Sequence, residues 1–178
     1  MNTAKNILYL HETSKMAGAE NSLIQLVRNL DRSRFNAFFA IPEEGPLADA
    51  ARTAGAGVEL MKFPKFRYGI GIPSVLGAVK GLVRAKGIAL IHSNSIRTHL
   101  YGVIAARACG ISDVWHERNL ITTELIDPDR ALAFLPDAIV CNSHAIARRF
   151  MRRGRPFRNV RVIYNGVDTE LFSPAVSG

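Results

Sequence analysis

The chain has 178 residues, of which 48% are hydrophobic and 21% charged, and this composition favours one folded domain over a disordered chain. No apolar run approaches the roughly 18 residues that span a bilayer, and the N-terminus lacks the pattern of a signal peptide, so we expect a cytoplasmic protein. The formal net charge of +8 favours anionic partners, namely phosphates, acidic lipid surfaces or nucleic acid, without selecting one of them.

Short apolar runs alternate with helical patterns along the whole chain. Strands are predicted over residues 6–11, 35–41, 58–61, 88–92, 113–116, 138–141 and 160–164. Helices are predicted over residues 20–30, 45–54, 73–87 and 100–108 and from Ser143 to about Arg153, with a loop over residues 62–72. This alternation predicts the α/β class, with a parallel sheet of about seven strands and helices on both faces.

The turn after the first strand contains Ala17, Gly18 and Ala19 and leads into a helix that begins near Glu20. A glycine turn between a strand and a helix can bind an anion through backbone N–H groups and the positive end of the helix dipole. The G-x-G-x-x-G and P-loop patterns are both missing, so a purely structural turn is equally compatible with this stretch.

Ligands of parallel sheets bind outside the carboxyl ends of the strands, which makes the strand exits candidates for a site. The polar side chains at these exits include Ser93, Asn94, His116, Arg118, Ser143 and Asn165, the last followed by Gly166. An imidazole such as that of His116 can bond a phosphate or a sugar hydroxyl, although a bond to the backbone would also explain a histidine at a strand end.

The other histidines at strand ends, His11, His92 and His144, are more simply explained as structural. No two of these four histidines have ligand spacing on one helix, so no metal is expected. The G-x-S-x-G pattern is missing, so nothing supports hydrolase chemistry. Cys109 and Cys141 lie outside any paired pattern and are expected to be reduced thiols.

Basic residues gather in two segments. Lys62, Lys65 and Arg67 alternate with aromatic residues, and Arg148, Arg149 and Arg152 fall in the last predicted helix. Both segments can be solvated surface, and both can also bind an anionic membrane. No recognised nucleic-acid motif occurs, so we expect no nucleic-acid partner.

Four stretches together resemble family 4 glycosyltransferases of the GT-B fold. They are MAGAE (residues 16–20), IHSNSIRTHLYGVIAARACGI (91–111), DAIVCNSHAIARRF (137–150) and VRVIYNGVDTELFSP (160–174). The resemblance implies a Rossmann-like, acceptor-binding N-terminal domain over residues 1–174 and the start of an interdomain linker at 175–178. It also implies a donor-binding C-terminal domain that is absent from this chain.

The implied activity is transfer of a sugar from a nucleotide-diphosphate sugar to an acceptor, which is a glycan or a lipid-linked molecule. Retention of configuration, no metal and no cofactor beyond the donor substrate are expected, and this chain alone is expected to be inactive. A lipid-linked acceptor would place the protein at the inner face of the membrane. The alternative from the residues is a non-catalytic basic module that docks on an anionic membrane or polymer.

The resemblance also suggests roles for particular residues. His116 matches a histidine that points into the cleft and is the candidate catalytic residue. Residues expected to bind acceptor or donor phosphate are Ala17, Gly18, Ala19, Glu20, Ser93, Asn94, Arg97, Arg118 and Ser143. Ala17 departs from the family, in which a glycine is usual at that position, and Asn165 and Gly166 match a hinge turn.

Overall fold

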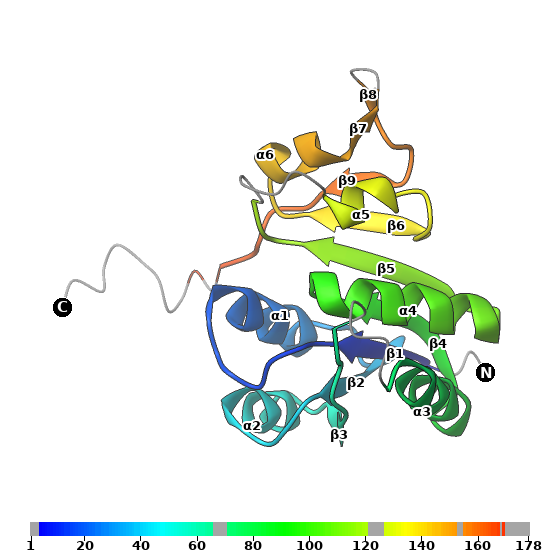
Figure 1. Ribbon diagram of the computed structural model, residues 1–178. Helices are drawn as coiled ribbons and strands as arrows, with labels where there is room; N and C mark the ends of the chain where they lie inside the picture. Colours follow the sequence, from blue (N-terminus) through cyan, green and yellow to red (C-terminus); the bar gives the residue numbers. More distant parts are fainter. Residues whose placement is uncertain (1–3, 66–70, 121–126, 153–154, 168, 170–178) are drawn as a thin grey trace.

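The computed structural model describes residues 4–65, 71–120, 127–152, 155–167 and 169 (Figure 1). Seven parallel strands form one sheet in the order β3-β2-β1-β4-β5-β6-β9. They are β1 (Lys5–Leu10), β2 (Phe35–Ile41), β3 (Gly57–Leu60), β4 (Ile88–Ser93), β5 (Ser112–Glu117), β6 (Ala138–Cys141) and β9 (Val160–Val162). The predicted fold class, a Rossmann-like α/β sheet of about seven parallel strands, is confirmed.

Helices cover both faces of the sheet, as predicted. They are α1 (Gly18–Arg28), α2 (Pro46–Thr53), α3 (Ile72–Ala85), α4 (Ile96–Cys109), α5 (Pro128–Ala131) and α6 (His144–Ala147). The alternation along β1 separates the faces, because Ile7 and Tyr9 pack with α1 and α2 whereas Leu8 and Leu10 pack with α3 and α4. Helices α4 and α6 and the segment after α5 pack over β5 and β6 in a third cluster that contains Trp115 and Cys141.

Helix α4 begins at Ile96, not at Leu100 as the sequence suggested. The Ser95 N–H donates to Thr98 Oγ1 at 3.2 Å, and the two hydroxyl oxygens lie 3.0 Å apart. This pair caps the helix four residues before the apolar pattern becomes visible. The early start places Arg97 in the first turn of α4 and not in a loop.

The predicted last helix is wrong beyond Phe150. Helix α6 ends at Ala147, a 3-10 turn covers Arg148–Phe150, and β7 (Met151–Arg152) then pairs antiparallel with β8 (Arg155–Pro156). Phe150 is fully buried, and its carbonyl accepts a hydrogen bond from the Phe157 N–H at 3.0 Å. Burial of this aromatic ring turns the chain back on itself, which outweighs the helical pattern of the arginine-rich stretch.

Within the described residues, α3 and α4 are the longest helices at 14 residues each, and no helix has the length and apolar character needed to cross a membrane.

Asp113 lies near the start of β5, and its side chain is buried at 2% exposure. Burial first, and then the carboxylate of Asp137, raises the pKa of Asp113 from 3.8 to about 7. Between these two pH values the folded state holds a proton that the unfolded state has released, so the stability of the protein falls as the pH rises through this window.

We expect Asp113→Asn to remove this loss of stability with rising pH, because the amide carries no charge to desolvate. The free energy of unfolding should rise by about 2 kcal/mol at pH 8 and change little at pH 4. Urea unfolding at both pH values measures the effect, with the exposed Asp49→Asn as the matched control. A variant that keeps the wild-type dependence on pH contradicts the prediction.

Candidate functional site

A row of aromatic and imidazole rings crosses the sheet on the face covered by α1. The row runs through Phe39, Tyr9, His92 and His116, which lie on β2, β1, β4 and β5, with successive ring centroids 5.3, 5.1 and 5.3 Å apart. His116 comes one residue before the end of β5. The last imidazole of the row, that of His116, therefore lies at the carboxyl edge of the sheet, where ligands of such sheets bind.

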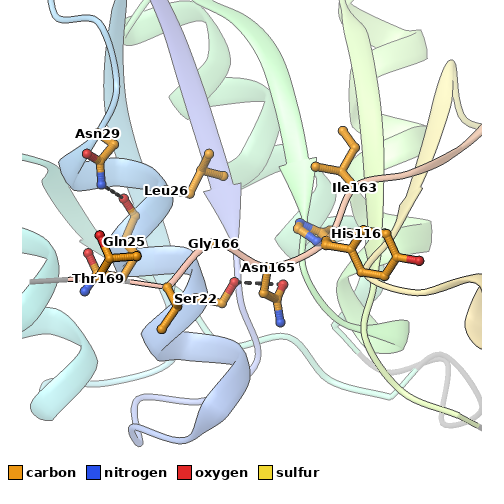
Figure 2. A pocket seen from close by; sticks show the side chains of 11 residues that line it. Ser22, Gln25, Leu26, Asn29, His116, Ile163, Asn165, Gly166 and Thr169 are labelled. Carbon is orange, nitrogen blue, oxygen red and sulfur yellow. Dashed lines mark hydrogen bonds between the residues drawn. The ribbon is translucent and has the colours of Figure 1, made fainter. Parts of the chain in front are cut away.

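A cavity of about 650 Å³ lies beside His116 (Figure 2). Helix α1 forms one wall and the segment after β9 forms the other, and Ser22 donates a hydrogen bond to Asn165 Oδ1 at 3.0 Å between them. The lining residues are Ser22, Gln25, Leu26, Asn29, His116, Ile163, Tyr164, Asn165, Gly166, Val167 and Thr169.

The strand-exit rule identified three of these lining residues, His116, Asn165 and Gly166, and missed the rest. Asn165 and Gly166 were assigned to a hinge turn, but they line the cavity. The wall residues of α1, at positions 22, 25, 26 and 29, follow the i, i+3, i+4, i+7 spacing of one helical face. That spacing is the available signal in the sequence, although the face contains both polar and apolar side chains.

His116 is held in place by two nitrogen atoms of neighbouring side chains. Its Nδ1 lies 3.0 Å from Arg118 Nη2 and 3.2 Å from His92 Nε2. Burial first, and then the positive charge of Arg118, lowers the pKa of His116 from 6.5 to about 2. His116 is therefore a neutral imidazole at physiological pH.

Arg118 and Asn94 support this imidazole. Arg118 Nη1 donates to Asn94 Oδ1 at 3.0 Å, and Asn94 Nδ2 donates to the His92 carbonyl at 2.9 Å. Burial lowers the pKa of Arg118 to about 10, so the guanidinium remains charged at neutral pH. No carboxylate of the described residues forms an ion pair with it, which leaves a positive charge beside His116.

The turn before α1 is already bonded to an anion of the protein itself, the carboxylate of Glu20 in the first turn of the helix. Glu20 Oε2 accepts from the Ala17 N–H at 3.0 Å, and Glu20 Oε1 lies 3.0 Å from His11 Nε2. The hydrogen bond from His11 is the main cause that lowers the pKa of Glu20. Gly18 is exposed, with open space where a Cβ would lie, so Gly18 and Ala19 remain accessible to a ligand.

Three other predicted binding residues are covered or paired within the protein. Ser93 is fully buried, and a Cβ added at Gly102 of α4 would collide with its hydroxyl, so it does not line the cavity. Arg97 forms an ion pair with Glu12 at 3.1 Å. Ser143 accepts from the Ile146 N–H at 3.3 Å and caps α6.

A buried ionic cluster that was not predicted from the sequence lies on the α4 side of β5. His99 Nδ1 is 3.2 Å from Glu117 Oε1 and 3.3 Å from Asp129 Oδ1, and the His99 ring stacks on Trp115. These three polar side chains could hold a cation, because their ligand atoms lie within 4.8 Å of one another. The expectation of no metal rested on the spacing of His11, His92, His116 and His144. His99, the histidine of this cluster, was not among them.

Arg149 is part of this cluster and not of a basic surface, which corrects the prediction for that residue. Its side chain is 7% exposed and donates to Glu117 Oε2 at 2.9 Å and to both oxygens of Asp127 at 3.0 Å. A guanidinium therefore already supplies positive charge next to Glu117.

The remaining basic residues come from separate elements. Lys62 and Lys65 are exposed after β3, and Arg148 is exposed after α6. In the sheet, four strands lie between β3 and β6, the strands that precede these two segments. Arg67 lies outside the described residues, and Arg152 belongs to β7.

A parallel sheet with helices on both faces and a cavity beside the strand exits is the arrangement of Rossmann-like α/β folds. The chain belongs to Glycosyltransferase Family 4, whose family model matches residues 16–171. This confirms the family suggested by the four stretches of sequence. A search of the curated proteins gave no match.

Solved structures support the fold. HepE of Anabaena, in complex with UDP and glucose, is 23% identical with a TM-score of 0.75, and the match covers 96% of this chain and 47% of that chain. A glycosyltransferase from Rickettsia africae is 12% identical with a TM-score of 0.81, covering 98% of this chain and 46% of that chain. MurG of Acinetobacter baumannii is 10% identical with a TM-score of 0.64, covering 85% and 44%. The chain thus spans about half the length of the structures that it matches and has the fold of a GT-B half.

Proposed function

We propose that this chain is the acceptor-side half of a transferase that moves a sugar from a nucleotide-diphosphate sugar to a glycan or lipid-linked acceptor. The observation that carries this proposal is the neutral His116 beside a 650 Å³ cavity in a chain of Glycosyltransferase Family 4. Two of the similar structures, HepE and MnaA of S. aureus, were solved with UDP. The donor would be held chiefly by a second domain, which residues after about 174 would join to this one.

In this proposal the residues at the cavity bind and orient the acceptor. His116 and Arg118 face the reacting groups, and Gly18 and Ala19 offer backbone N–H groups at the start of α1. Transfer would occur with retention of configuration, as the resemblance to the family implies. It would need no metal, because helix dipoles and basic side chains can neutralise a leaving phosphate.

The test is sugar transfer by the natural protein that carries this chain. It is incubated with a panel of UDP- and GDP-sugars and with glycan and lipid-linked acceptors, with and without EDTA. We expect product with the same anomeric configuration as the donor, insensitivity to EDTA, and no turnover by the 178-residue chain alone. The proposal is wrong if no pair of donor and acceptor gives transfer even though an acceptor binds at the cavity.

A second proposal is that the protein docks on anionic membrane from the cytoplasm. It is favoured by the exposed Lys62 and Lys65 and by the net charge of +8. Flotation with vesicles that contain or lack phosphatidylglycerol tests it, and binding should be lost in the Lys62→Gln, Lys65→Gln variant. Flotation that is independent of acidic lipid contradicts this docking.

A further inference from the structure

The two ring nitrogens of His116 have different surroundings. Nδ1 has two close neighbours, Arg118 Nη2 at 3.0 Å and His92 Nε2 at 3.2 Å. Nε2 is buried and has no hydrogen-bond partner among the described residues. The residue is 9% exposed and lines the cavity (Figure 2). A buried polar nitrogen without a partner, next to a cavity, needs a partner from outside the chain, which is a water or a ligand atom.

The neighbours of Nδ1 determine where the proton lies. A guanidinium can only donate, so a proton on Nδ1 would place two N–H groups against each other at 3.0 Å. Nδ1 therefore offers its lone pair, and the single proton of the neutral ring lies on Nε2. His92 shares the same lone pair as a second donor, which requires a proton on its own Nε2.

We propose that Arg118 is a positioning residue that fixes His116 as the Nε2–H tautomer, so that His116 donates a hydrogen bond to a ligand oxygen and removes no proton from it. Asn94 assists by holding Arg118 Nη1 at 3.0 Å. The identity of the ligand, whose oxygen belongs to a phosphate or a sugar hydroxyl, rests on the proposed function. The tautomer does not, because it follows from contacts within this chain.

Imidazole nitrogen NMR on the chain itself, without any ligand, tests the tautomer at pH 7. His116 is assigned by comparison with His116→Gln. We expect a single neutral form with about 90% or more of the proton on Nε2, since opposing a charge-assisted hydrogen bond costs about 1.5–3 kcal/mol. A proton on Nδ1, or a mixture of the two tautomers in the wild-type protein, overturns the proposal.

The role of Arg118 is tested by substitution. In Arg118→Met, the Nδ1–H form should appear, since His92 Nε2 can then accept, and the pKa of His116 should rise because the charge of Arg118 no longer opposes protonation. Arg118→Lys, which keeps a donor and a charge, should retain the Nε2–H form in part. Arg97→Met removes a nearby arginine that pairs with Glu12 and should change neither quantity. If Arg118→Met keeps both the wild-type tautomer and the wild-type pKa while remaining folded, Arg118 does not position His116.

Two ligand probes separate the sources of the oxygen. Inorganic pyrophosphate and methyl glucoside are added in turn, and the His116 Nε2–H resonance is followed. A shift with pyrophosphate assigns the oxygen to phosphate, and a shift with the glucoside assigns it to a hydroxyl. If neither probe moves the resonance at saturating concentration, His116 does not donate to a ligand, even where the tautomer is as expected. The failure of sugar transfer by the whole protein would leave the tautomer result unaffected.

Discussion

Replacing His116 by alanine is expected to lower kcat/KM for sugar transfer by about 10²–10³-fold in the natural protein that carries this chain. This is the usual loss when one preorganised donor is removed from a site that excludes water. The donor is preorganised here because its ring is held by Arg118 at 3.0 Å and by His92 at 3.2 Å. Initial-rate measurements over a range of donor and acceptor concentrations give the value.

His116→Gln is the matched variant, since its amide can donate near the position of Nε2 but cannot remove a proton. We expect it to keep activity within about tenfold of the wild type, as for a donor of similar geometry. Urea unfolding midpoints show whether either variant is less stable. Equal losses in the alanine and glutamine variants, together with an acid limb in the wild-type pH profile, would instead identify His116 as a general base.

Much of the fold could be predicted from local patterns. The bounds of β2 and β6 agree residue for residue with the prediction, because Pro42 ends one apolar run and Asp137 precedes the other. The end of α6 could not be predicted, since it depends on the burial of Phe150 and on its backbone bond with Phe157. Local periodicity contains no information about contacts of that kind.

The candidate site was predictable to a similar extent. The rule that ligands bind at strand exits selected His116 and Arg118, and the structure brings them together beside the cavity. The rule could not show which polar exits are used internally, so it also selected Ser93, which α4 covers at Gly102. Nor could it find the buried cluster, because His99, Glu117 and Asp129 meet only through the packing of α4, β5 and α5.

Replacing Arg149 by methionine is expected to destabilise the protein by about 3–5 kcal/mol, the usual cost of removing one partner from a buried ionic cluster. Its guanidinium donates to Asp127 and Glu117 and also to the Asn119 carbonyl at 2.8 Å. The variant leaves these acceptors without their donor in a region of low dielectric. The neighbouring Arg148 is exposed, so Arg148→Met should change the stability by less than about 0.5 kcal/mol. Equilibrium urea unfolding at pH 7.5 compares the two.

The dependence on pH identifies the electrostatic part of this loss. Burial raises the pKa of Glu117 to about 7, so this carboxyl is mostly protonated at pH 5 and gains less from Arg149 there. Burial opposes the ionisation of Asp127, but the hydrogen bonds from Arg149 and from the Arg130 N–H outweigh it and lower its pKa. The stability from Asp127 is therefore complete above the pKa of its unfolded form and is lost as the pH falls through the folded one. The Glu117 shift predicts that the difference in stability between Arg149→Met and the wild type narrows on going from pH 7.5 to pH 5, and the Asp127 shift predicts that it narrows further below pH 5. A difference that is independent of pH would mean that Arg149 stabilises the protein mainly by packing its stem, including against the Phe150 ring that lies 5.2 Å from its guanidinium carbon.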